Sequence, residues 1–327
     1  MKKNKRYDSQ YFVAAGISLL LLTAVFQLSA RTLPGFGTWY AHHIYSWIVK
    51  SVGRLTGLLP FSVVEMGLYG LLCLLFLDVV RLSAVLIRPE TAKILTVIGR
   101  RWLLIVSALL FLYTVNCGIN YYASSFSSYA GLEDGTYTVE ELEALCSDLV
   151  ELVNESAKSG RQFYRENRSA WRSEAVTAMQ AAGEQFSCLG GFYPKPKEVL
   201  VSRILSVQQL CGVYSPFTVE ANYNGDMPDY NVPHTLCHEL SHLKGFMRED
   251  EANFIGYLAC TSSEDRSFRY SGYLTGWVYA GNALAKADYE GFIELYEKLD
   301  EKARNDLEDN NVFWDRFEGK TAEVSTK

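Results

Sequence analysis

Two histidines and a glutamate lie within one short stretch of the chain, at a spacing that suits a metal ion. The segment NVPHTLCHELSHLKGF contains His238, Glu239 and His242, which form an HExxH pattern. Residues four apart lie on one face of a helix, so both imidazoles can bind a single Zn²⁺. Glu239 follows the first histidine, where its carboxylate can take a proton from water. The pattern predicts a zinc site; the alternative is a polar helix face without metal, because a bare HExxH also occurs by chance.

The residues around this pattern predict a short helix that holds it. Pro233 suits a first turn, and Gly245 suits the left-handed residue that ends a helix. We therefore expect a helix over residues 234–244, with Asn231 as its N-terminal cap. Three leucines at helical spacing predict a buried face beside the histidines: Leu236, Leu240 and Leu243.

His234 lies one helical turn before His238, but it is too far from His242 along the helix to be a third ligand of the same ion. Eight residues separate His234 from His242, about 12 Å along a helix axis. Ligand atoms lie only ~2 Å from a zinc ion. We therefore expect His234 to support a ligand, to contact substrate or to lie on the surface of the first turn.

The third ligand is expected from the next segment, MREDEANFIGYLAC. On a helix that begins near residue 248, Glu249 shares a face with Asn253 and with small residues that let another helix approach. Glu251 shares its face with large apolar residues, which is typical of core packing. We expect Glu249 to be the ligand and keep Glu251 as the alternative. Asn253, one turn beyond Glu249, is well placed to hold a ligand imidazole.

These motifs, HELSH followed by E-x-x-x-N, resemble those of the gluzincin class of zinc metallopeptidases. In that class the first Glu of the second motif binds the metal, and the residue four positions later orients a ligand histidine. The resemblance implies these two roles for Glu249 and Asn253, with Asn in place of the commoner Asp. The whole chain also resembles a family of uncharacterised bacterial membrane proteins with a domain of unknown function, which implies a peptidase without an established substrate.

The expected function is that of a membrane-anchored zinc metallopeptidase acting on a peptide or protein. Zinc and Glu239 would activate water, and a further donor would stabilise the oxyanion, with His234 and Tyr270 among the candidates. An edge strand over residues 217–222 would hold the substrate backbone, and its Glu220 or Asn222 would contact a substrate terminus; the alternative for either residue is a solvated strand edge. The alternative is a zinc-stabilised binding or sensing module without turnover.

Three apolar segments precede the metal motif and predict membrane helices. They cover about residues 11–30, 61–80 and 102–123, and each is long enough to cross the ~30 Å apolar core of a lipid bilayer. The first is longer than the apolar region of a typical signal peptide and lacks a clear cleavage site before Arg31. We therefore expect residues 1–123 to form a membrane anchor and residues 124–327 to form a separate domain.

Basic residues predict the orientation of this anchor. The N-terminal segment 2–6 and the segment 81–101 together hold nine Lys and Arg, whereas the segment 31–60 holds three. Because cytoplasmic loops are enriched in Lys and Arg, the N-terminus is expected in the cytoplasm. The odd number of spans then places residues 124–327 outside it.

Composition limits the fold and the partners of the remaining chain. Residues 123–327 contain 19 basic and 33 acidic residues, so this part is a poor binder of nucleic acid. Thr138 and Glu141 form a capping-box pattern, and a second helix is expected over residues 170–185. We expect a mainly α protein whose second domain is α+β and zincin-like, with a small sheet.

Overall fold

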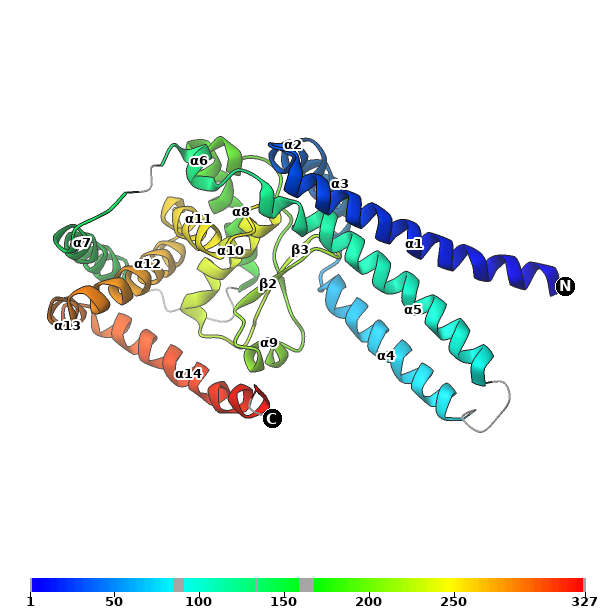
Figure 1. Ribbon diagram of the computed structural model, residues 1–327. Coiled ribbons are helices and arrows are strands. Elements are labelled where there is room, and N and C mark those ends of the chain that lie inside the picture. Colours follow the sequence, from blue (N-terminus) through cyan, green and yellow to red (C-terminus); the bar gives the residue numbers. More distant parts are fainter. Residues whose placement is uncertain (1, 85–90, 133–134, 159–167, 326–327) are drawn as a thin grey trace. The chain divides into compact units, whose positions relative to one another are not determined.

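The chain divides into two units, which the computed structural model describes over residues 2–84, 91–132, 135–158 and 168–325 (Figure 1). The first unit contains Met1–Val52, Val63–Ser124 and Ser215–Val219. The second unit contains Gly53–Ser62, Ser125–Tyr214 and Glu220–Lys327. Part of the basic segment that predicts the orientation, residues 85–90, lies outside the described residues.

Long apolar helices dominate the first unit: α1 (Lys2–Thr32), α4 (Val63–Ser83) and α5 (Thr91–Tyr113). Among the residues that the structure describes, three stretches are long and apolar enough to cross a membrane: Gln10–Thr32, Val63–Ser83 and Thr91–Tyr122. The three predicted apolar helices are therefore confirmed. The third helix begins at Thr91, before the predicted start at residue 102, because the prediction followed the uncharged run and Lys93, Arg100 and Arg101 precede that run. Arg101 and Trp102 both donate hydrogen bonds to the Asp78 carboxylate of α4.

Short helical segments connect and extend these helices. Between α1 and α4 lie α2 (Phe36–Tyr40), a π-helical turn (Ala41–Tyr45) and α3 (Ser46–Gly57). A second π turn (Thr114–Gly118) and a 3₁₀ turn (Asn120–Tyr122) extend α5.

The second unit is mainly helical and contains a small sheet, so the prediction of a mainly α protein with a small sheet is confirmed. Its helices are α6 (Phe126–Ala130), α7 (Val139–Ala157), α8 (Arg168–Gln185), α9 (Arg203–Val207), α10 (Val232–Lys244), α11 (Glu249–Ser262), α12 (Arg266–Ala287), α13 (Tyr289–Glu297) and α14 (Glu301–Ser325). The capping box at the start of α7 is present, since the Thr138 side chain and the Glu141 side chain each accept a hydrogen bond from the backbone N–H of the other residue.

A small sheet completes this unit, with strands β1 (Lys197–Glu198), β2 (Gly212–Ser215) and β3 (Glu220–Tyr223). The order is β1-β3-β2, and β1 runs parallel to β3 with Lys197 opposite Asn222. The prediction of an edge strand over residues 217–222 is wrong. The chain turns through Val219, whose φ is 55°, and the strand that follows is paired on both sides.

A buried ion pair explains why Glu220 does not contact substrate at this strand. The Lys197 ammonium donates a hydrogen bond to the Glu220 carboxylate, and both side chains are almost fully buried. Lys197 also donates to the carbonyl of Thr56, at 2.6 Å. A carboxylate buried with such a partner is stabilised where it lies and is not free to bind a substrate terminus.

Candidate metal centre

The helix that carries the HExxH pattern is α10, and its end follows from local sequence. Gly245 adopts a left-handed conformation (φ 114°), and its N–H donates to the carbonyl of His242 at 2.9 Å. Pro233 lies in the first turn, as predicted. Asn231 is the N-terminal cap residue, as predicted, but its side chain makes no capping hydrogen bond; its amide donates instead to Asn310 of α14, at 2.7 Å.

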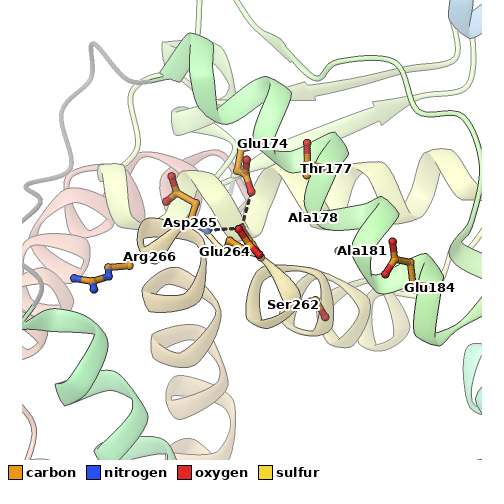
Figure 2. Close-up of a pocket in the computed structure, with 10 residues that line it drawn as sticks. Glu174, Thr177, Ala178, Ala181, Glu184, Ser262, Glu264, Asp265 and Arg266 are labelled. Carbon is orange, nitrogen blue, oxygen red and sulfur yellow. Dashed lines mark hydrogen bonds between the residues drawn. The ribbon is translucent and has the colours of Figure 1, made fainter.

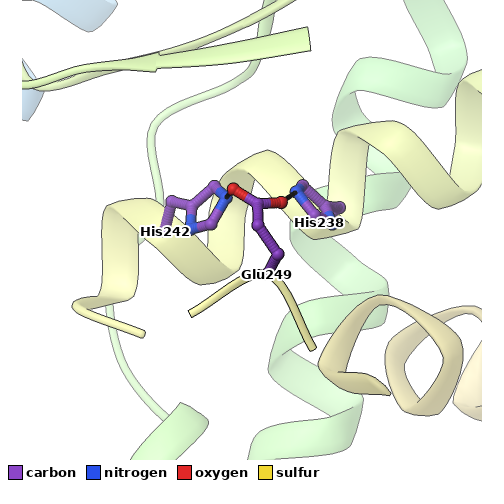
Figure 3. A group of neighbouring side chains, drawn as sticks. All are labelled: His238, His242 and Glu249. Carbon is purple, nitrogen blue, oxygen red and sulfur yellow. Dashed lines mark ion pairs between the residues drawn. The ribbon is translucent and has the colours of Figure 1, made fainter. Parts of the chain in front are cut away.

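The structure brings His238, His242 and Glu249 together (Figure 3). His238 Nε2 lies 3.3 Å from one carboxylate oxygen of Glu249, and His242 Nε2 lies 3.5 Å from the other. The two imidazole rings are nearly perpendicular, with centroids 4.7 Å apart. All three donor atoms therefore face one small volume between α10 and the first turn of α11.

This arrangement fits the donors that zinc prefers. The three donor atoms lie within 4.8 Å of one another. In a tetrahedral site with bonds of ~2.1 Å, two ligand atoms lie roughly 3.4 Å apart, so small side-chain movements suffice to bind an ion. Within the described residues the group has three members, which is the number of protein ligands that catalytic zinc sites use. The Glu249 side chain is 76% exposed, so the group is open to solvent on the side of this carboxylate.

Hydrogen bonds and charge prepare these groups for a cation. His242 Nδ1 lies 2.8 Å from the carbonyl of Phe246, which can only accept, so Nδ1 carries a proton and Nε2 faces Glu249. Hydrogen bonds from His238 and His242 hold the pKa of Glu249 well below its usual range. Burial lowers the pKa of His242, but the nearby Glu249 and Glu239 carboxylates outweigh that effect and raise it.

Glu239 lies buried beside the two histidines. Its Oε2 has no hydrogen-bond partner among the residues that the structure describes. Burial raises its pKa, whereas the charges of His238 and His242 act in the opposite direction. A buried carboxylate oxygen without a partner is costly unless water or another polar group satisfies it, so this atom is available to bind a water molecule.

Gly212 of β2 makes room for this carboxylate, which the sequence did not indicate. A Cβ atom at position 212 would lie 2.5 Å from Glu239 Oε1 and 2.8 Å from the carbonyl of Asn222. The neighbouring Cys211 thiol has its pKa raised to about 12, chiefly by burial and also by the charge of Glu239. The β2 strand therefore forms one wall of the site.

His234 and Asn253 lie beside the centre but outside the ligand group. His234 Nε2 lies 3.1 Å from the backbone carbonyl of Asn253, and this contact joins α10 to α11. Burial lowers the pKa of His234 to about 4. The Asn253 side chain bonds to Tyr279 of α12, while the carbonyl of Phe246 takes the orienting position at His242.

Glu251 and Tyr270 are not brought to the centre. Glu251 accepts hydrogen bonds from the backbone N–H of Phe126 at 3.2 Å and from Arg248 at 3.3 Å. Tyr270 is buried in the apolar core around Trp277, and its hydroxyl donates to Asp306 at 2.6 Å. Each of these two side chains therefore has a structural role away from the metal ligands.

Tyr279 is a site residue that the sequence gave no reason to single out. Burial raises the pKa of its hydroxyl, as do the charges of Cys211 and Glu249, and the Asn253 side chain lies within hydrogen-bond reach. Its position follows from the packing of α12 on α11, which no local motif encodes. Its phenol is partly exposed and pairs with Asn253, which lies one turn after Glu249.

A separate groove of about 860 Å³ lies between α8 and the connection from α11 to α12 (Figure 2). Its lining is mostly acidic and small: Glu174, Thr177, Ala178, Ala181, Glu184, Ser262, Ser263, Glu264, Asp265 and Arg266. The Glu174 carboxylate accepts a hydrogen bond from Ser263 Oγ at 2.6 Å. None of the predicted site residues lines this groove, so the metal centre is distinct from it.

Comparison with known proteins identifies a family but no activity. Residues 40–327 match the model of a family described as protein of unknown function (DUF3810). No curated protein and no solved structure matches the chain. The predicted resemblance to an uncharacterised family is confirmed, whereas the resemblance to gluzincins stays a prediction. Since the match covers most of its length, the chain belongs to this DUF3810 family of proteins of unknown function.

Proposed function

We propose that this protein is a membrane-anchored, zinc-dependent metallopeptidase. The observation that carries the proposal is the convergence of His238, His242 and Glu249 within 4.8 Å, on two helices held together by close packing. The buried carboxylate of Glu239 next to these ligands supplies the second requirement of a hydrolase, a group that moves protons.

In the proposed hydrolysis, Glu239 transfers a proton and Tyr279 is a candidate hydrogen-bond donor. A bound Zn²⁺ acidifies water and polarises a peptide carbonyl. Glu239 takes a proton from the attacking water, whose oxygen bonds to the carbonyl carbon, and passes that proton to the leaving amine as the C–N bond breaks. The Tyr279 hydroxyl is a candidate donor to the oxyanion, in place of Tyr270.

The proposed location follows from the apolar helices and the distribution of basic residues. Three helices suit a lipid bilayer, and the excess of Lys and Arg at residues 2–6 and 81–101 favours a cytoplasmic N-terminus. We infer that the second unit is extracytoplasmic and that its substrates are peptides or proteins there. The solvent-exposed side of Glu249 supports access by a polypeptide.

The proposal is tested with the full chain and the Glu239→Gln variant, both purified in detergent. Zinc content is measured by mass spectrometry, and cleavage is measured with a peptide library. We expect one zinc per chain in both proteins, chelator-sensitive cleavage by the wild type, and at least a roughly 100-fold loss of cleavage in the variant. Glu174→Gln, in the separate groove, is the matched control and should cleave normally.

Three results would contradict the peptidase. Equal cleavage by the wild type and Glu239→Gln would remove the proposed base. Absence of zinc from both would remove the metal centre. Zinc in both proteins with no cleavage of any library peptide by the wild type would favour the binding or sensing module.

A further inference from the structure

An exposed aromatic stripe follows the connection between the first two apolar helices. It consists of Trp39, His43 and Trp47, four residues apart, and the two indoles are 49% and 68% exposed. The His43 ring stacks on Trp39 with centroids 5.5 Å apart, and its Nδ1 lies 2.9 Å from the Trp39 carbonyl. Large aromatic side chains at a water-exposed surface are unfavourable unless something else covers them.

The π turn at Ala41–Tyr45 keeps this stripe on one face. In a regular α-helix, residues four apart drift by ~40° per step around the axis. A π turn has wider, i→i+5 turns, which reduces the rotation per residue and therefore the drift. The opposite face carries Tyr45 and Val49, which are buried. The segment is thus amphipathic, with its aromatic side pointing away from the protein.

The place of this segment in the chain indicates what covers the stripe. It follows α1, which ends at Thr32, and precedes α4, which begins at Val63, and each of these helices is long and apolar enough to cross a bilayer. A short connection between two consecutive membrane-spanning helices remains near the membrane surface at which the first helix ends. Residues 33–62 contain Lys50 and Arg54 and no acidic residue, so lipid phosphates would not repel them.

We propose that the stripe of Trp39, His43 and Trp47 lies in the headgroup layer of a phospholipid bilayer. Trp is enriched at this depth because its ring is apolar and its N–H is polar. Lys50, exposed one turn after Trp47, extends toward the phosphates. This surface anchors the connection between α1 and α4, and it does not depend on the metal centre.

The test measures the depth of Trp47 in the full chain reconstituted into phosphatidylcholine vesicles. The contribution of Trp47 is the fluorescence difference between the wild type and Trp47→Phe. Nitroxide groups are placed on the lipid headgroup or near the end of the acyl chain, and iodide is added to the water. We expect the headgroup label to quench this contribution at least twofold more than the chain-end label, with little quenching by iodide.

The buried Trp277 is the internal reference, because its contribution, obtained from Trp277→Phe, should respond to none of the quenchers. Quenching of Trp47 by iodide and not by lipid labels would show a water-exposed stripe and overturn the proposal. Protection from every quencher would also overturn it, since a protein partner or a second copy of the chain would then cover the stripe. Stronger quenching by the chain-end label would place the segment inside the bilayer, which contradicts it as well.

Discussion

The first turn of α11 offers three consecutive acidic residues, and the tertiary structure gives them different surroundings. Glu249 faces both histidines of α10, at 3.3 and 3.5 Å. Glu251 instead accepts a hydrogen bond from the N–H of Phe126. Two positions along the helix therefore separate the proposed metal ligand, Glu249, from Glu251, which holds the start of α6.

The different surroundings of Glu249 and Glu251 predict different effects of two matched substitutions on zinc affinity. Glu249→Gln replaces an anionic ligand by a neutral one, so zinc affinity should fall roughly 100-fold or more. Glu251→Gln keeps an acceptor for Phe126 and should leave zinc affinity within about twofold. Competition titration with a fluorescent zinc chelator measures both values. Equal zinc affinity in the wild type and Glu249→Gln would contradict the assigned ligand.

Replacing Gly212 by Ala is expected to reduce peptide cleavage without removing zinc. In Gly212→Ala the new methyl group would lie 2.5 Å from Glu239 Oε1, so the carboxylate must move. Because misplacing a catalytic group by about 1 Å costs roughly 100-fold in rate, cleavage should fall by about that factor while zinc content stays at one per chain. Steady-state cleavage and metal analysis of one preparation test this. Normal cleavage would show that Glu239 tolerates displacement.

At the scale of elements, the close approach of α10 and α11 holds the metal ligands together. Ser241 Oγ lies 3.3 Å from the carbonyl of Ala252, and Gly256 lies against His234. The buried thiols of Cys237 and Cys260 also meet across this interface. Small residues allow the two backbones to come near enough for a carboxylate on one helix to reach imidazoles on the other.

At Gly256 the close approach of α10 and α11 leaves little room for a side chain. A Cβ atom there would lie 3.0 Å from His234 Nε2 and 3.3 Å from the backbone N of His238. We therefore expect Gly256→Ala to destabilise the second unit by about 1–3 kcal/mol and to weaken zinc binding. Urea unfolding and zinc titration measure the two effects. Gly70→Ala is the control, because nothing lies within 4 Å of its added Cβ atom; equal effects of both substitutions would contradict the packing argument.

At the scale of the whole molecule, zinc should stabilise the unit that binds it. A ligand that binds only the folded state adds about 2.7 kcal/mol when its concentration is 100 times Kd. A strong chelator should therefore lower the Tm of the second unit in the wild type and leave the first unit unchanged. Calorimetry of the wild type and His238→Gln tests this, because the variant should show the lower Tm with or without chelator. An unchanged Tm in the chelated wild type would mean that folding and zinc binding are not coupled.

The sequence by itself determined the features that depend on neighbouring residues. The HExxH spacing, the left-handed stop at Gly245 and the capping box at Thr138 are local patterns, because a helix turn involves residues only three or four apart. The long apolar runs determined the three membrane-length helices, since length and hydropathy suffice for that prediction.

Only the tertiary structure decided the features that join distant parts of the chain. It made β3 a central strand, placed the Gly212 backbone against Glu239, and moved Tyr270 into the core while Tyr279 came to the site. It also brought Glu249, which the sequence already favoured over Glu251, to within reach of both histidines. These outcomes depend on how helices and strands pack, and packing depends on the shape and volume of side chains that are far apart in sequence, which no local period records.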